Sequence, residues 1–92
     1  MEKLKVALLS NGYNEEQAKI AMEKLYNISP SLTQGLNEWA NNGNEMDYTI
    51  EGIKLSKLKL QYKLTYPAAL LTMDWLIREP EKALASIKRG IR

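Results

Sequence analysis

The sequence contains no cysteine and no histidine among its 92 residues. Without cysteine the chain forms no disulfide and offers no thiolate to a metal, which is typical of proteins in a reducing compartment. Without histidine it lacks the commonest metal ligand and the side chain best suited to proton transfer near neutral pH. We therefore expect a cytoplasmic protein that binds no metal and no cofactor.

Long apolar segments and glycine-rich motifs are missing as well. No run reaches the roughly 20 apolar residues that span a bilayer. The apolar run at positions 6–9 is shorter than the roughly 7 to 15 residues of a signal peptide. The five glycines are scattered and form no phosphate-binding loop. We expect no membrane partner, and we predict no catalytic residues: the protein is not an enzyme.

What the chain does contain is typical of one small folded domain. Apolar residues make up 45% and charged residues 26% of it. Residues 1–51 carry four lysines and eight acidic residues, whereas residues 52–92 carry nine Lys or Arg and three acidic residues. Such asymmetry indicates an acidic partner, two lobes that meet each other, or, most simply, solvated helix faces. The abundance of Lys, Asn, Ile and Tyr is typical of AT-rich genomes and favours a bacterial or phage source.

Three short helices are predicted in the first half. The first ends at Gly12, which fits the left-handed position after a helix. Asn14 is the expected N-cap of the second helix, with Gln17 in the capping-box position. A third helix is expected to begin with Ser31 as its cap. The stripes predicted to be buried in the second and third helices are Ala18, Ala21, Met22, Leu25 and Leu32, Gly35, Leu36, Trp39.

The run LLSNGYNEEQAKIAM resembles the opening of a ubiquitin-associated (UBA) domain, and the likeness covers about residues 3–43. The matching positions are Gly12, Tyr13, Gln17, Ala18, Ala21 and Met22, followed by Leu32, Gly35, Leu36 and Trp39. The resemblance implies a three-helix fold and a protein-binding surface at Gly12 and Tyr13. Asn11 replaces the loop methionine that the family presents to ubiquitin, and the second helix is about three residues longer, so ubiquitin is not the expected partner. A well-formed turn explains Gly12 and Tyr13 equally well.

The second half begins with an ambiguous region. DYTIEGI, near residues 48–53, is either a short β-strand or an extended linker. In LSKLKLQYKL the leucines and Tyr62 alternate with polar residues as in a strand. The alternative is a helix capped by Ser56 that buries Leu58 and Tyr62, and the helix-forming composition favours it.

The stretch PAALLTMDWLI, residues 67–77, is apolar nearly all round and is predicted to be a central helix. Thr65 is its expected cap, and Pro80 opens a last helix. A helix apolar on every side belongs inside a structure. Leu71 and Trp75 are the residues expected to stay open for a protein partner or a second copy of the chain, as in a homodimer.

Residues 55–77 have the outline of a helix-turn-helix. The spacing of Ser56, Leu58, Tyr62, Leu64, Tyr66 and Ala69 resembles that of winged-helix modules in bacterial DNA translocases. That resemblance implies nucleic-acid binding, for which the candidates are Lys54, Lys57, Lys59 and Lys63. The second helix offers no Arg, Lys, Asn or Gln to base edges in its first two turns, so contacts would go to phosphates. Lysines that merely solubilise an amphipathic segment are the simpler interpretation.

The sequence thus predicts a mainly α, single compact domain of about six short helices. A UBA-like lobe at residues 1–43 is expected to pack on a C-terminal helical lobe at residues 46–92. The predicted function is a small protein–protein interaction module, with Gly12, Tyr13, Leu71 and Trp75 as candidate binding residues. The alternative is a helix-turn-helix protein that binds nucleic acid largely through phosphates.

Overall fold

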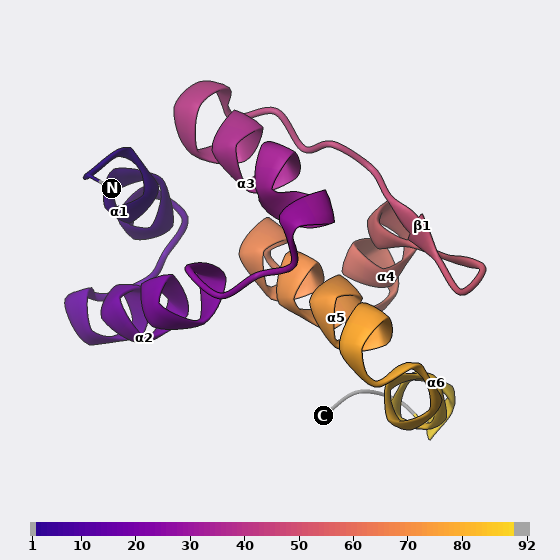
Figure 1. Ribbon diagram of the computed structural model, residues 1–92. Coiled ribbons are helices and arrows are strands. Elements are labelled where there is room, and N and C mark those ends of the chain that lie inside the picture. Colours follow the sequence, from indigo (N-terminus) through magenta and orange to yellow (C-terminus); the bar gives the residue numbers. More distant parts are fainter. Residues whose placement is uncertain (1, 90–92) are drawn as a thin grey trace. The chain divides into compact units, whose positions relative to one another are not determined.

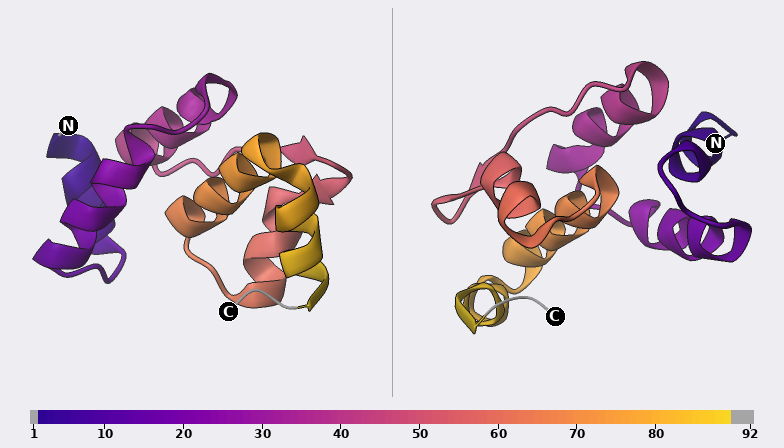
Figure 2. Two further views of the ribbon diagram at one scale, coloured as in Figure 1. Left: turned by 60° about the horizontal axis from the view of Figure 1, so that its bottom comes forward. Right: turned by 180° about the vertical axis from the view of Figure 1, so that it is seen from behind.

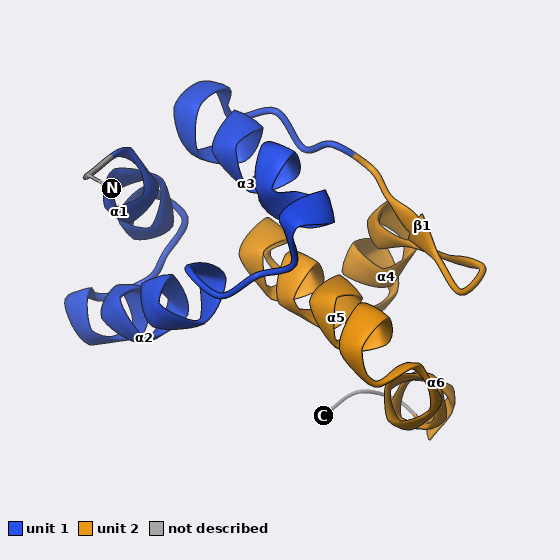
Figure 3. Ribbon diagram, viewed as in Figure 1, with its two compact units in different colours: residues 1–46 blue, residues 47–92 orange. Residues whose placement is uncertain are grey.

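The computed structural model describes residues 2–89 and shows six helices and one two-stranded sheet in that range (Figure 1). The prediction of a mainly helical protein is confirmed. The chain divides into two compact units, unit 1 of residues 1–46 and unit 2 of residues 47–92 (Figure 3). The elements in chain order are α1 (Glu2–Ser10), α2 (Glu15–Leu25), α3 (Pro30–Asn42), β1 (Thr49–Ile50), β2 (Ile53–Lys54), α4 (Leu55–Tyr62), α5 (Tyr66–Arg78) and α6 (Pro80–Arg89).

Unit 1 is built on α1, which packs against both α2 and α3. Each helix contributes one apolar stripe, as its periodicity predicts. The side chains that this packing buries most completely are Leu4, Leu8, Ala18, Leu25, Leu32 and Leu36. One predicted member of the α2 stripe is wrong: Met22 is only half-buried, because it lies at the margin of the stripe and not at its centre.

Of the two helix caps predicted in unit 1, one is present in the structure and the other is not. Asn14 and Gln17 form the predicted capping box, with the Gln17 backbone N–H donating to Asn14 Oδ1 at 2.8 Å and the Asn14 N–H to Gln17 Oε1 at 3.1 Å. The predicted cap at Ser31 is wrong. The N-cap residue of α3 is Ser29, two residues earlier, and the helix begins at Pro30, because proline is well suited to the first position of a helix, where its missing N–H costs nothing.

Unit 2 begins with a hairpin of two very short strands. β1 and β2 pair antiparallel, with Thr49 opposite Lys54 and Ile50 opposite Ile53. The two turn residues, Glu51 and Gly52, have φ angles of 53° and 76°. Positive φ at both central positions is the geometry of a tight type I′ turn, which suits the twist of paired strands. The stretch near residues 48–53, predicted as a short strand or an extended linker, therefore contains β1, the turn and the first residue of β2.

The ambiguous stretch after the hairpin is the helix α4, and the strand alternative is wrong. A strand would have placed Leu58 and Leu60 on the same face. The helix buries Leu55 and Leu58, three residues apart, and leaves Leu60 82% exposed. Helix α4 ends at Tyr62, and the cap residue that follows, Lys63, takes a left-handed conformation with φ 55°.

Ser56 does not cap α4 as predicted, because it lies inside the helix. The cap comes from Asp47, nine residues earlier, whose Oδ1 accepts the Ser56 backbone N–H at 2.9 Å. The Ser56 hydroxyl donates to Asp47 Oδ2, also at 2.9 Å. A carboxylate at this place satisfies a free N–H and neutralises the positive end of the helix dipole.

The apolar helix α5 is the centre of unit 2, where it is contacted by α4, α6 and β1. Figure 2 shows these elements gathered around it in both views. Thr65 caps it as predicted, its Oγ1 accepting the Ala68 N–H at 3.3 Å. The helix ends at Arg78, before Pro80 opens α6. The side chains of α5 that this packing buries are Tyr66, Pro67, Ala69, Leu70, Met73 and Leu76.

A hydrogen bond joins α4 to the end of α6. The Tyr62 hydroxyl donates to the backbone carbonyl of Ile87 at 2.7 Å, in a partly buried position. The last four carbonyl groups of a helix have no partner within it, so Tyr62 satisfies one of them. The sequence also places a helix stop at Gly90, which lies outside the described residues.

Candidate functional site

The Gly12–Tyr13 turn, the first predicted binding site, is closed against the end of α1. Gly12 has φ 94°, and the Tyr13 N–H donates to the Leu8 carbonyl at 3.2 Å. Asn11, at the position of the family's loop methionine, donates its side-chain amide to the Ala7 carbonyl at 2.7 Å. Tyr13 itself is half-buried. The geometry of this turn is that of a helix C-terminus whose carbonyls are satisfied locally.

Leu71 and Trp75, the second predicted binding pair, lie one turn apart on α5 in unit 2, and both are half-buried. The Trp75 indole N–H donates to Glu79 Oε1 at 3.2 Å. The carboxylate of Glu79 also pairs with Lys82 at 3.3 Å. These two interactions, first that with Lys82, lower the pKa of Glu79 below its ordinary value. The indole N–H of Trp75 is therefore already hydrogen-bonded within unit 2.

The four lysines proposed for phosphate contacts do not form one stripe. Lys54 lies in β2, and the other three lie on or at the end of α4. Lys57 lies three residues before Leu60, and Lys63 follows the last residue of α4, where its left-handed backbone takes its side chain out of the helical series. Lys59 lies closest to the buried side and is half-buried. Helix α4 thus exposes a leucine, Leu60, with a lysine three residues before it and another three residues after it.

Helix α5 does not present the surface that a base-reading helix needs. Its first two turns bury Tyr66, Pro67, Ala69 and Leu70. Reading base edges requires exposed hydrogen-bonding side chains that reach into the major groove. The exposed residues of α5 are Ile77 and Arg78 in its last turn, and Arg78 pairs with Asp74 at 3.0 Å.

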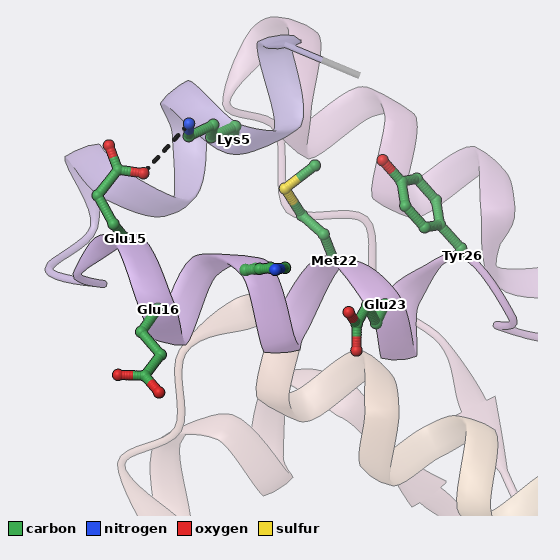
Figure 4. A pocket seen from close by; sticks show the side chains of 7 residues that line it. Lys5, Glu15, Glu16, Met22, Glu23 and Tyr26 are labelled. Atoms are coloured by element: carbon green, nitrogen blue, oxygen red, sulfur yellow. Dashed lines mark ion pairs between the residues drawn. The ribbon is translucent and has the colours of Figure 1, made fainter.

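A groove on α1 and α2 is one hollow within unit 1 (Figure 4). Its volume is about 580 Å³. It is lined by Lys5 from α1 and by Glu15, Glu16, Lys19, Met22, Glu23 and Tyr26 from α2 and the residue that follows it. Met22 is half-buried, and Tyr26 is 55% exposed. Two apolar side chains are thereby accessible on a surface that is otherwise charged.

The two sides of the groove differ in how their charges are used. On the α1 side, Lys5 Nζ lies 3.1 Å from Glu15 Oε2 and ties the two helices together. Glu16 and Glu23 point to the other side of α2, away from α1 (Figure 4). Within the described part of the chain, neither of these two carboxylates has an ion-pair partner. They form an acidic ridge along α2, with the groove on one side and Ile20, 49% exposed, on the other.

A second hollow of unit 1 is smaller, about 360 Å³, and lies between α1 and the end of α3. Its lining residues are Lys3, Val6, Ala7, Ala40 and Asn41. Val6 is 61% exposed there. This hollow has no acidic side chain in its lining, so it differs from the α1–α2 groove in charge.

The α1–α2 groove is not among the sites predicted from the sequence. Met22 was predicted to be buried, and no role was predicted for Lys5 or Tyr26. The available signal was the α2 sequence itself: Met22 and Tyr26 recur four residues apart, at the edge of the stripe formed by Ala18, Ala21 and Leu25. The predicted residues Gly12 and Tyr13 lie in unit 1, whereas Leu71 and Trp75 lie in unit 2.

No group of three or more acidic residues that could hold a metal ion occurs within residues 2–89. None of the helices in that range has the length and apolar character needed to cross a bilayer. Comparison of the chain with protein-family models, with characterised proteins and with solved structures finds no match.

Proposed function

We propose that the protein is a non-enzymatic protein-binding module whose binding surface is the α1–α2 groove of unit 1. One observation carries the proposal: Met22 and Tyr26 are accessible to solvent in a groove between two helices. Tyrosine and methionine are enriched at protein interfaces, because each combines a large apolar surface with adaptable contacts. The charged rim supplies the polar border that surrounds the apolar centre of most interfaces.

The resemblance of residues 3–43 to UBA domains supports a binding role for this unit. The proposal does not extend to ubiquitin, because Asn11 replaces the loop methionine and donates its amide to the Ala7 carbonyl. It also assigns no catalysis. Within the described part of the chain, the two carboxyl groups whose pKa is lowered are Asp47 and Glu79, and hydrogen bonds that hold helices and side chains in place explain both shifts.

Photo-crosslinking from inside the groove tests the proposal. A benzoylphenylalanine placed at Tyr26 is expected to give a discrete adduct in cells, because this side chain is large, accessible and part of the groove lining. The same residue at Thr33, an exposed position of α3, is the matched control. The adduct should disappear when Met22→Lys places a charge on the groove floor. Equal labelling from both positions, or an adduct insensitive to Met22→Lys, would contradict the proposal.

A further inference from the structure

The surface of α4 is complementary to the acidic ridge beside the groove. Leu60, 82% exposed, lies between Lys57 and Lys63, each three residues away. On α2, Glu16 and Glu23 lie along one ridge, with apolar side chains accessible on both sides of it. Helix α4, together with the residue that follows it, thus has an exposed leucine with a lysine before it and a lysine after it. Helix α2 has two glutamates beside an apolar hollow.

The spacing of the charges matches as well. Lys57 and Lys63 are separated by about 9 Å along the α4 axis, and Glu16 and Glu23 by about 10 Å along α2, at about 1.5 Å per residue. Two helices laid side by side bring both pairs within reach, since lysine and glutamate side chains are long and flexible. Lys57 and Lys63 have no ion-pair partner among the described residues. Each of the four charges is available to a partner.

We propose that α4 of one copy of this chain docks on the α1–α2 groove of a second copy. Leu60 inserts beside Met22 and Tyr26, while Lys57 and Lys63 contact Glu16 and Glu23. The inference rests on the proposed function, for which it names the partner. The two units have net charges of opposite sign, which favours this contact. Residues 1–46 contain four lysines and six acids, and residues 47–92 contain nine Lys or Arg and five acids. Lys19, in the groove lining, is the one cation there that opposes the incoming lysines and has no ion pair among the described residues.

The proposed contact joins two different surfaces, so it is heterologous and either closes into a ring or extends into a chain of copies. A single short helix buries a small area, so association is weak and depends on concentration. It also depends on salt, because the contact includes two exposed pairs of opposite charge. We expect the sedimentation coefficient to rise with protein concentration at about 50 mM salt and much less at about 300 mM.

Two variants, each lacking one of the surfaces, provide the decisive test. Leu60→Gln removes the apolar tip of α4, and Glu16→Lys with Glu23→Lys reverses the ridge; all three side chains are exposed, so the fold is retained. We expect each variant alone to associate about tenfold or more weakly than the natural chain. Their mixture should form a one-to-one complex, because each variant keeps the surface that the other lacks. Val6→Gln, at an exposed apolar residue outside the groove, is the matched control and should associate as the natural chain does.

A natural chain that stays monomeric up to about 1 mM at low salt would overturn the inference, since this range covers weak contacts. So would a mixture of the two variants that does not form a complex. The groove adduct described above separates this inference from the proposed function. An adduct with twice the mass of the chain supports self-association, whereas an adduct of another mass that Met22→Lys abolishes retains the function and refutes the second copy as the partner.

Discussion

Asp47 caps helix α4 from outside it, through two hydrogen bonds of 2.9 Å to the backbone N–H and the hydroxyl of Ser56. The hairpin between the two residues is what brings them together, because it returns the chain so that Asp47 lies at the first turn of α4. Asp47 Oδ1 also accepts the Tyr48 N–H at 2.9 Å. One carboxylate therefore fixes both the entrance to the hairpin and the start of the helix.

Replacing Asp47 with alanine should lower the free energy of unfolding by about 0.5–2 kcal/mol, the usual cost of a lost helix cap. Urea unfolding followed by circular dichroism measures it. Glu51→Ala is the control for removal of an acidic side chain in the hairpin without loss of a cap. If the two variants lose the same stability, Asp47 does not act as a cap.

The same contact predicts a dependence on pH. The hydrogen bond from the Ser56 N–H, with smaller contributions from the Ser56 hydroxyl and the Tyr48 N–H, lowers the pKa of Asp47 below its ordinary value. A lowered pKa in the folded state means that the stabilisation is present above the pKa of the unfolded chain, about 3.9, and is lost as the pH falls through the folded value. The stability difference between the natural chain and Asp47→Ala should therefore be constant from neutral pH to about 5 and shrink below about 4. A difference that grows on acidification would contradict this assignment.

The capping box of α2 makes a prediction that needs only local structure. Asn14→Ala removes the acceptor for the Gln17 N–H and should cost about 1 kcal/mol of stability. Asn37→Ala, on the exposed face of α3, is the same substitution in a helix interior and should change stability by less than about 0.5 kcal/mol. Chemical denaturation of the two variants side by side measures both. Equal costs would show that the Asn14 side chain contributes nothing as a cap.

The caps show which features of this fold can be predicted from sequence. Asn14 with Gln17, and Thr65 with its helix, were predicted correctly because donor and acceptor lie within three residues. Asp47 was not predicted, because its partner is nine residues away across a turn whose geometry depends on Glu51 and Gly52. Ser56 was predicted as the cap instead, because serine is a favoured N-cap residue and lies at the start of this helical stretch.

The candidate groove shows the corresponding limit for function. Periodicity identifies the side of α2 that faces the core, and Ala18, Ala21 and Leu25 are buried as predicted. It does not say how far the neighbouring helix covers a side chain at the margin of that stripe. Met22 lies at this margin, so its exposure depends on the position of α1 and could not be derived from the α2 sequence alone.

Tyr62→Phe should destabilise unit 2 by about 0.5–1.5 kcal/mol, because it leaves the Ile87 carbonyl without its hydroxyl donor. Amide hydrogen exchange in α6 should speed up more than exchange in α5, since the lost bond anchors the end of α6. Tyr26→Phe, at an exposed tyrosine in unit 1, is the control and should leave the stability of unit 2 unchanged. Unchanged exchange in α6 after Tyr62→Phe would refute an anchoring role for this hydrogen bond.

Binding of duplex DNA should be weak, because Lys54 lies outside α4 and the exposed Leu60 interrupts the lysines of the helix. Phosphate contacts add up only where cations follow the backbone together. Fluorescence anisotropy with a labelled duplex at about 50 and 200 mM salt measures it, since phosphate contacts weaken steeply over this range. Tight binding at the lower salt that collapses at the higher one would instead favour the nucleic-acid alternative.

The same substitution should have very different effects on stability at two leucines of unit 2. Leu70 is fully buried in the central helix α5, so Leu70→Ala leaves a cavity and should cost about 2–5 kcal/mol. Leu60 is 82% exposed, so Leu60→Ala should change stability by less than about 0.5 kcal/mol. If α4 docks on a second copy as proposed, Leu60→Ala weakens self-association without lowering the stability of the chain. Leu70→Ala, in contrast, affects association only under conditions where the chain begins to unfold. Thermal unfolding and sedimentation of both variants at matched concentrations measure the two effects separately. A large loss of stability from Leu60→Ala would show that this leucine is covered within its own chain, and it would remove the basis for a docking role.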